Sequence, residues 1–262
     1  MDFIMHACIP FTIKGHVAVI TMSNAPANTW THDSLDGLAD LIHDFNKDKN
    51  IYSLVITGAG EKFFSAGADL KLFANCDKQT AVLIATAFGR AFEALSQFRG
   101  LSIAAINGYA MGGGLEVALA CDLRIAESQA QMSLPEAAVG LLPCAGGTQN
   151  LAWLVGEGWA KRMILCGERV GAQQALDIGL VEAVVESGQA LEQALLWAQK
   201  SEKQSPTSVA ACKRLIQNAR SHPMLEGMAC ERDEFVNLFN SNDQKEGVQA
   251  FLEKRLPQWT NS

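Results

Sequence analysis

Residues 102–116 read Ser102-Ile-Ala-Ala-Ile-Asn-Gly-Tyr-Ala-Met-Gly-Gly-Gly-Leu-Glu116. The stretch 101–106 is mostly apolar, which is typical of a buried strand. A turn follows it, and the glycines 112–114 begin a short apolar helix before a further strand at 123–126. Strands that alternate with helices in this way predict an α/β fold.

A second segment repeats this order of elements. The strand residues 53–58 lead through a polar turn to Ser65-Ala-Gly-Ala-Asp69. In both segments small residues let a ligand approach the backbone, and free N–H groups at a helix N-terminus attract negative charge. Together the segments favour two N–H donors that converge on one oxygen, an oxyanion hole. Taken singly, each segment is more simply interpreted as glycines that form turns or let a strand and a helix pack closely.

The rest of the chain continues the α/β pattern as far as about residue 200. Apolar spacing predicts one more strand, at 16–22, and two helices, at 33–46 and 79–98. The strand that contains residues 53–58 is expected to begin at residue 51. From about residue 205 to the end the pattern is helical only. We therefore divide the chain into a catalytic core, residues 1–200, and a helical region, residues 205–262.

Composition and charge narrow the class of protein. The 262 residues include 28 acidic and 21 basic side chains, a net charge of −7, with 48% hydrophobic and 19% charged residues. This composition is globular, and its acidity argues against nucleic-acid binding, which depends on Lys and Arg. The most apolar region, 101–121, contains Asn107 and Glu116, so a membrane span is not expected.

The N-terminal residues and the cysteines bear on location. Residues 1–6 lack the basic and long apolar parts of a secretory signal, and the first Arg is Arg90, so no Arg-rich presequence is expected. The seven cysteines form no CxxC pair. Such a scattered, odd set predicts reduced thiols in a cytoplasmic protein, most of them core residues, and no metal site.

Several common catalytic motifs are missing from the sequence. Val117 stands where a dinucleotide fingerprint needs its third glycine, and there is no P-loop. Ser65 lacks the leading glycine of a nucleophile elbow, and the five histidines form no metal-binding pattern. Dehydrogenase, kinase, hydrolase and zinc-enzyme functions are thereby disfavoured.

Two glutamates are notable for their apolar neighbours. Glu116 has only glycines and apolar residues three and four positions away, so burial without a local cation should raise its pKa. The alternative is that Glu116 points to solvent or pairs with a distant Arg. Glu136 follows Ser133-Leu-Pro135 at a predicted helix start, where a capping role is the simpler interpretation.

These segments belong to a longer series of motifs that runs in order from the first strand to the tail. The motifs are Phe64-Ser-Ala-Gly-Ala-Asp-Leu-Lys71, Ala105–Glu116, Ala120-Cys-Asp-Leu-Arg-Ile-Ala126, Pro135-Glu136, Gly140-Leu-Leu-Pro143, Ala145-Gly-Gly-Thr-Gln149, Ala175-Leu-Asp-Ile-Gly-Leu-Val181 and Lys245–Arg255. Together they resemble the crotonase family, the enoyl-CoA hydratase/isomerase superfamily.

The resemblance implies a crotonase-like spiral of ββα units with a C-terminal α-helical trimerisation region, in homotrimers or dimers of trimers. It implies an acyl-CoA thioester as substrate, no separate cofactor, and neither nucleic acid nor membrane as partner. By the same resemblance, the backbone N–H groups of Ala68 and Gly113 form the oxyanion hole for the thioester C=O. CoA would contact Ala66 and Lys71, and Lys254 would reach a CoA phosphate on its own or a neighbouring subunit.

Members of the family differ in which acidic positions are filled, and hydratases resemble one another in carrying both glutamates. Glu116 and Glu136 therefore predict an enoyl-CoA hydratase, a carbon–oxygen lyase acting on the C2=C3 bond of 2-trans-enoyl-CoA. Glu116 would activate water for attack at C3, and Glu136 would deliver a proton to C2. Two alternatives stay open: an isomerase of 3-enoyl-CoA that uses Glu136 alone, and a CoA-binding member without catalysis.

The sequence departs from the family pattern near the predicted site. The loop 24–30 is shorter than the common spacing, so we assign no CoA contact there. Cys144 stands where glycine is frequent, and its side chain is expected to narrow the pocket beside Glu136. A nucleophilic thiol is less favoured, because no His lies nearby in sequence. Five aromatic residues either line the pocket or, more commonly at helical spacing, belong to the core: Trp30, Phe73, Phe88, Trp153 and Trp159.

Overall fold

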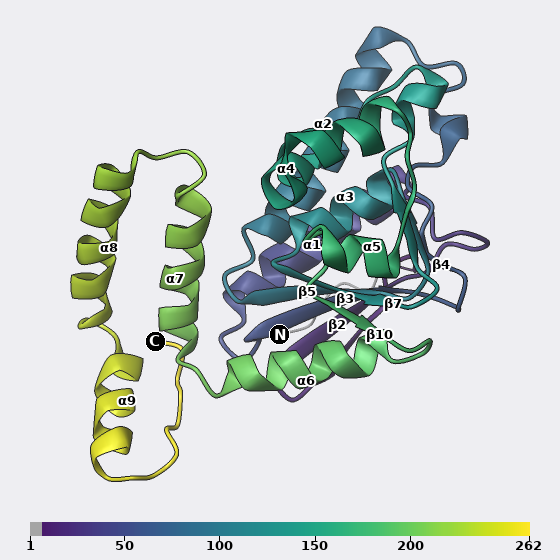
Figure 1. The fold of residues 1–262 in the computed structure, drawn as a ribbon. Helices are drawn as coiled ribbons and strands as arrows, with labels where there is room; N and C mark the ends of the chain where they lie inside the picture. Colours follow the sequence, from purple (N-terminus) through teal and green to yellow (C-terminus); the bar gives the residue numbers. More distant parts are fainter. Residues whose placement is uncertain (1–6) are drawn as a thin grey trace.

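A computed structural model describes residues 7–262 (Figure 1). Residues 1–6, which carry the prediction about a secretory signal, lie outside the described residues. The strands are β1 (Phe11–Lys14), β2 (Val17–Met22), β3 (Ser53–Gly58), β4 (Phe63–Ser65), β5 (Leu101–Ile106), β6 (Tyr109–Met111), β7 (Leu123–Glu127), β8 (Gln131–Ser133), β9 (Val170–Gly171) and β10 (Ala183–Val185). The helices are α1 (His32–Lys47), α2 (Lys78–Ser96), α3 (Gly113–Ala120), α4 (Gly147–Leu165), α5 (Ala172–Asp177), α6 (Ala190–Glu202), α7 (Pro206–Asn218), α8 (Met224–Leu238) and α9 (Asn242–Leu252), with short 3₁₀ turns η1 (Leu70–Leu72) and η2 (Glu136–Val139).

A six-stranded sheet lies at the centre of the fold. Its order is β1-β2-β3-β5-β7-β10, and all neighbours are parallel except β1 and β2. Because successive side chains point to opposite faces, Ala18 and Ile20 join the larger core, whereas Val17 and Val19 pack with residues of α6. Figure 1 shows α6 on one face of the sheet and α1, α2 and α3 on the other. Helices thus cover both faces, as parallel sheets require.

A smaller sheet of order β4-β6-β8-β9 positions the candidate site. Its first three strands are parallel, and each directly follows a strand of the large sheet: β4 follows β3, β6 follows β5, and β8 follows β7. Helical segments come next in each case. This repeated order is the ββα unit that the resemblance implied, so the predicted α/β class is confirmed. The segments after β4, β6 and β8 emerge at one edge of the small sheet.

The chain is helical after Ser205, as the periodicity predicted. Figure 1 shows α7, α8 and α9 beside the sheets rather than over them, joined to α6 by a short connection. No helix within residues 7–262 is long and apolar enough to cross a membrane. The division of the chain into two functional regions stays a prediction.

One buried carboxylate connects the beginning and the end of this helical region. Asp243, in the first turn of α9, is 1% exposed. One of its oxygens accepts the backbone N–H groups of Thr260 and Asn261 at 2.9 and 3.0 Å. The other accepts the hydroxyls of Ser205 and Thr207 at 3.3 and 3.4 Å. The C-terminal segment and the start of α7 therefore share one acceptor.

Replacing Asp243 with Ala is expected to lower the free energy of unfolding by about 1–3 kcal/mol, because partly buried donors lose their acceptor. Thermal unfolding measures the change. Glu253→Ala is the control, since it removes an exposed ion pair with Arg255 and should leave the melting temperature nearly unchanged. Equal melting temperatures for Asp243→Ala and the wild type would contradict the linking role.

The cysteines do not follow the prediction that most are core residues. All seven are free thiols, but only Cys121 is buried, while Cys144, Cys166 and Cys212 are exposed. The prediction was wrong because composition does not reveal position: Cys166 ends α4, for example, where the chain turns at the surface.

Candidate active site

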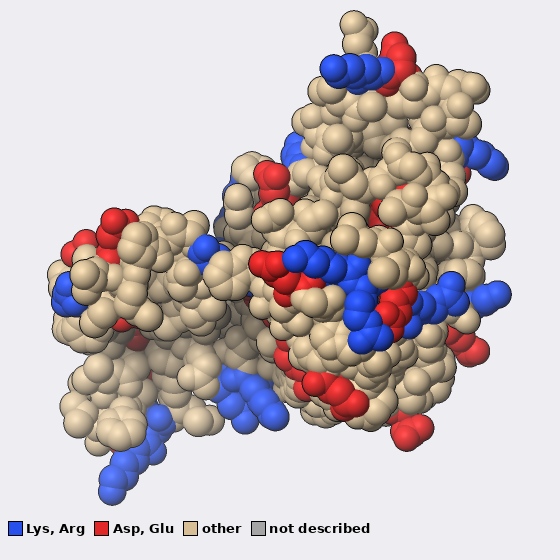
Figure 2. All heavy atoms as spheres, turned by 45° about the horizontal axis from the view of Figure 1, so that its top comes forward, with Lys and Arg blue, Asp and Glu red and all other residues tan. Residues whose placement is uncertain are grey.

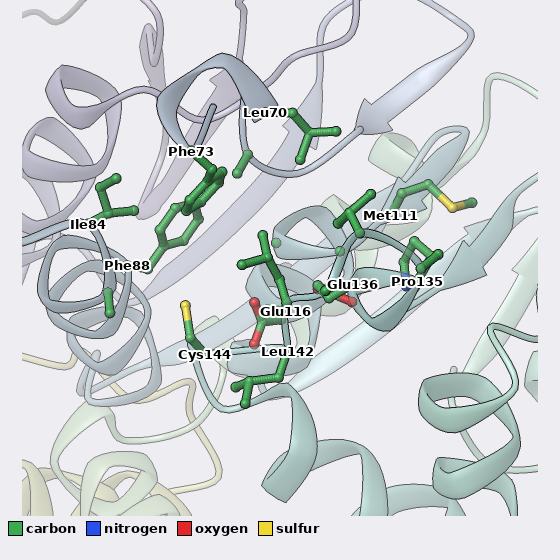
Figure 3. Close-up of a pocket in the computed structure, with 18 of the residues that line it drawn as sticks. Leu70, Phe73, Ile84, Phe88, Met111, Glu116, Pro135, Glu136, Leu142 and Cys144 are labelled. Carbon is green, nitrogen blue, oxygen red and sulfur yellow. The ribbon is translucent and has the colours of Figure 1, made fainter. Parts of the chain in front are cut away.

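Three segments of the chain meet at the edge of the small sheet. Ala66–Ala68 follows β4, Gly112–Gly114 follows β6, and Glu136 follows β8. Residues from all three segments line one cavity of about 590 Å³, shown in Figure 3. The topology therefore assembles a site from parts of the sequence that are far apart.

The backbone N–H groups of Ala68 and Gly113 lie in the segments that directly follow two paired strands, β4 and β6. The pair Ser65↔Ala110 sets the register of β4 with β6, and Ala68 and Gly113 each come three residues later. Among the described residues, neither N–H group donates a hydrogen bond. Both residues line the cavity. The two donors are thus available to one acceptor, as the paired segments had predicted.

Gly67 makes this close approach of the two segments sterically possible. It has a φ of +86°, which side-chain-bearing residues rarely adopt. A Cβ atom on Gly67 would lie 3.0 Å from the backbone N of Gly113 and 2.7 Å from the carbonyl O of Met111. A glycine is therefore required at this position for the two N–H donors to converge.

Glu116 lies in α3, one turn after Gly113, and is 3% exposed. Its Oε1 accepts the backbone N–H groups of Ala145 at 2.8 Å and Gly147 at 2.9 Å. Burial raises the pKa of Glu116, and these two hydrogen bonds partly oppose the rise. The expected burial and pKa shift are thus present, whereas neither alternative, solvent exposure or an Arg partner, is.

The two donors to Glu116 were missed in the sequence analysis. Ala145 lies in the loop before α4 and Gly147 is the first residue of α4, so both are far from Glu116 in the chain. The available signal was Gly147, where a Cβ atom would lie 2.8 Å from Oε1 of Glu116. Glycine at this position keeps the loop backbone close enough to hold the carboxylate.

Glu136 begins η2, yet its carboxylate does not cap that turn. Both of its side-chain oxygens are buried and have no hydrogen-bond partner. Burial raises the pKa of Glu136 to about 7, with a smaller contribution from the charge of Glu116. The capping interpretation was therefore wrong. A carboxyl group with a pKa near neutrality suits a general acid or base.

The cavity wall is largely apolar. Phe73 and Phe88 line it, as does Ile84 (Figure 3). Trp30 is instead a core residue, 1% exposed, whose Nε1 donates to the carbonyl O of Gly113 at 3.3 Å. Trp153, 58% exposed, does not line the cavity. Only two of the five candidate aromatic residues therefore belong to this wall.

Cys144 lies on the cavity wall across from Glu136 (Figure 3). Cys144 as a whole residue is exposed, but the cavity wall partly desolvates its thiol, which raises the pKa of the thiol to about 11, and the nearby Glu116 adds to the shift. The thiol is therefore protonated near neutral pH. This state argues against a nucleophilic role and makes Cys144 a small apolar wall residue.

The residues predicted to bind CoA are not all near the cavity. Ala66 lines it, and Lys71 is exposed in η1 beside Leu70, another lining residue. Lys254 is exposed after α9, in the helical region that Figure 1 shows away from the small sheet. One chain thus brings together Ala66, Ala68, Gly113, Glu116 and Glu136, with Lys71 close by but without Lys254.

Within residues 7–262, no three His, Cys, Asp or Glu side chains are grouped to hold a metal ion. On the face shown in Figure 2, basic and acidic side chains lie among one another rather than in one large basic patch.

These groups define a class of enzyme. Two free N–H donors are suited to stabilise an oxyanion, and two carboxylates of raised pKa in the same cavity are suited to move protons. This combination fits an acyl-transforming lyase or isomerase that passes through an enolate.

Comparison with known proteins identifies the family. The enoyl-CoA hydratase/isomerase family model matches residues 12–262. A probable enoyl-CoA hydratase of Bacillus subtilis is 37% identical over 253 residues, covering 96% of this chain and 98% of that protein. A short-chain-enoyl-CoA hydratase of Clostridium acetobutylicum is 36% identical over 92% of this chain and 93% of that protein. The chain belongs to the enoyl-CoA hydratase/isomerase family and is an enzyme of the hydratase type.

Solved structures agree with this assignment. Pseudomonas aeruginosa DspI has a TM-score of 0.95 and 62% identity, covering 98% of each chain. An enoyl-CoA hydratase of Bacillus anthracis has a TM-score of 0.93 and 36% identity, covering 97% of this chain and 100% of that one. The chain therefore has the crotonase fold.

Proposed function

We propose that the protein hydrates 2-trans-enoyl-CoA thioesters to 3-hydroxyacyl-CoA. One observation carries the proposal: the carboxylates of Glu116 and Glu136 line the same cavity as two free backbone N–H groups. The Glu116 carboxylate accepts two backbone hydrogen bonds, whereas the Glu136 carboxylate has no hydrogen-bond partner. Glu116 is held in place by backbone donors, which suits a base that orients water. Glu136 has a pKa of about 7, which suits a residue that transfers a proton.

The reaction follows from these roles. Water bonds through its oxygen to C3 as Glu116 takes one of its protons. The electron pair of C2=C3 moves toward the thioester oxygen, whose charge the N–H groups of Ala68 and Gly113 stabilise, each donor contributing about 10²–10³ in rate. Glu136 then gives its proton to C2, and a proton passes from Glu116 to Glu136 to restore the site. One water is added and no other reactant is consumed.

The remaining contacts with CoA are part of the same proposal. Ala66 and Lys71 would hold the CoA next to the cavity, and Lys71 offers a positive charge to its phosphates. Lys254 is too remote in one chain, so it would act on the CoA of a neighbouring subunit. The chain as a whole is acidic, which makes such basic residues important for an anionic substrate.

A trimer or a dimer of trimers would give α8 and α9 a partner. Both helices expose large apolar side chains to solvent. Figure 2 shows acidic and basic side chains elsewhere on the same helical region. Such exposure is unusual for a surface that stays in water. The exposed residues include Met224, Leu225, Phe235, Val236, Phe251 and Leu252. We also keep the prediction of a cytoplasmic location.

Separate incubations with crotonyl-CoA and with a 3-enoyl-CoA test the proposal. We expect hydration of crotonyl-CoA to 3-hydroxybutyryl-CoA at a rate well above conversion of the 3-enoyl isomer. Conversion of the 3-enoyl-CoA without hydration would instead identify an isomerase that uses Glu136 alone. Inactivity toward both, with CoA still bound, would identify a non-catalytic member.

A further inference from the structure

The catalytic cavity adjoins a second cavity that is open to solvent. This outer cavity, of about 690 Å³, runs along α2 and is lined mainly by exposed residues of that helix, which include Val82 and Thr86, and by Gly89. The two cavities share two wall residues, Ala85 and Cys144. They therefore meet where the side chains are small.

The pattern of side chains on α2 explains why the two cavities adjoin. Ala81, Ala85 and Phe88 lie at helical spacing and line the catalytic cavity. Ala85 and Gly89, four residues apart on the same helix face, line the outer one. Ala85 lines both cavities, and its side chain is only a methyl group. Across from it, Cys144 has a single Sγ atom beyond Cβ.

The chemistry of this junction favours hydrocarbon. Burial keeps the Cys144 thiol protonated, since its pKa rises to about 11, so neither junction residue is charged. Further out, Arg90 lies 2.9 Å from Asp40 and 3.5 Å from Asp36, and Glu93 also lines the outer cavity. With its one cation already paired, the outer cavity offers little attraction to a chain that ends in a carboxylate.

We propose that Ala85 and Cys144 determine acyl-chain length: chains longer than those that fill the catalytic cavity pass between these two residues into the outer cavity along α2. The inference rests on the proposed hydratase function and adds the substrate class, unbranched 2-enoyl-CoA with an unsubstituted hydrocarbon tail. Short chains stay in the catalytic cavity and do not depend on the junction.

The test compares kcat/KM for 2-trans-enoyl-CoAs from C4 to C16 in the wild type and in Cys144→Phe and Ala85→Leu. The wild type should hydrate C10 and C12 substrates within about tenfold of C4. In both variants the ratio of kcat/KM at C10 and longer to kcat/KM at C4 should fall tenfold or more, a size consistent with steric exclusion from an apolar pocket. Cys166→Phe is the matched control, because Cys166 is exposed and lines neither cavity.

Each result has a distinct meaning. A wild type that hydrates C4 but not C10 would overturn the inference and leave the hydratase function intact. The inference would also be overturned if kcat/KM in the variants depended on acyl-chain length as it does in the wild type, including the case in which kcat/KM falls by the same factor at every length. If no enoyl-CoA is hydrated at any length, the proposed function itself fails. Retained C4 activity also shows that each variant is folded.

Discussion

Replacing Glu136 with Gln is expected to lower kcat for crotonyl-CoA hydration by about 10²- to 10⁴-fold. The amide keeps the shape of the carboxyl group but cannot give up a proton to C2. The N–H pair and the apolar wall are unchanged, so KM should change much less than kcat. Loss of the ultraviolet absorbance of the conjugated thioester measures the rate. Wild-type turnover in this variant would contradict the proton-transfer role.

The pH dependence of the free energy of unfolding gives a second test of Glu136→Gln, one that does not depend on catalysis. Ionised Glu136 has no partner in the fold, and burial raises its pKa from 4.5 to about 7. Its ionised form therefore disfavours the folded state as the pH rises from 4.5 through 7, whereas its neutral form does not. Glu136→Gln should be more stable than the wild type at about pH 8, by on the order of 1 kcal/mol, and equal to it near pH 4.

The wild-type pH profile follows from the same pKa. Glu136 gives a proton in the hydration direction, so kcat/KM should fall as the pH rises through about 7 and the carboxyl group ionises. Glu116 and Glu136 influence each other's charge, so the profile reports the pair rather than either residue alone.

Replacing Glu116 with Gln is the second change with a large expected effect, again about 10²- to 10⁴-fold in the kcat of hydration. The Gln carbonyl oxygen still accepts the N–H groups of Ala145 and Gly147, so the loop before α4 keeps its position. What the variant loses is the base that takes a proton from water.

Glu116→Gln also distinguishes the two reactions of the family. Isomerisation of a 3-enoyl-CoA by Glu136 alone needs no water, so any such activity should survive in this variant while hydration is lost. Hydration at the wild-type rate in Glu116→Gln would show that Glu116 does not activate the water. Thermal unfolding of the two variants beside the wild type provides the control for folding.

The sequence predicted the long elements of the fold well, because their apolar periodicity is local. The helices expected at 33–46 and 79–98 are His32–Lys47 and Lys78–Ser96. The small sheet was not predicted, because β4, β6 and β8 have three residues each, too few for a periodic pattern. They were read as turns, although they align the segments of the site.

The site was predicted unevenly for a related physical reason. Small residues after two strands pointed to the two segments that line the cavity, and the oxyanion-hole role of Ala68 and Gly113 within them stays a prediction from the family resemblance. The environment of Glu136 was misjudged, because proximity in sequence to a helix start suggested capping whereas its oxygens are buried without a partner. The partners of Glu116 were not foreseen, since they come from a loop that only the folded chain brings near.

The alignment of Ala68 with Gly113 has a consequence for how this scaffold changes its chemistry. Pairing of β4 with β6 sets the positions from which the two segments start, and no side chain is needed for their N–H groups to face one cavity. In the proposed mechanism, the group that activates the carbonyl is therefore backbone alone. New reactivity can therefore evolve by exchanging the two carboxylates, while the means of activating a carbonyl is inherited with the sheet.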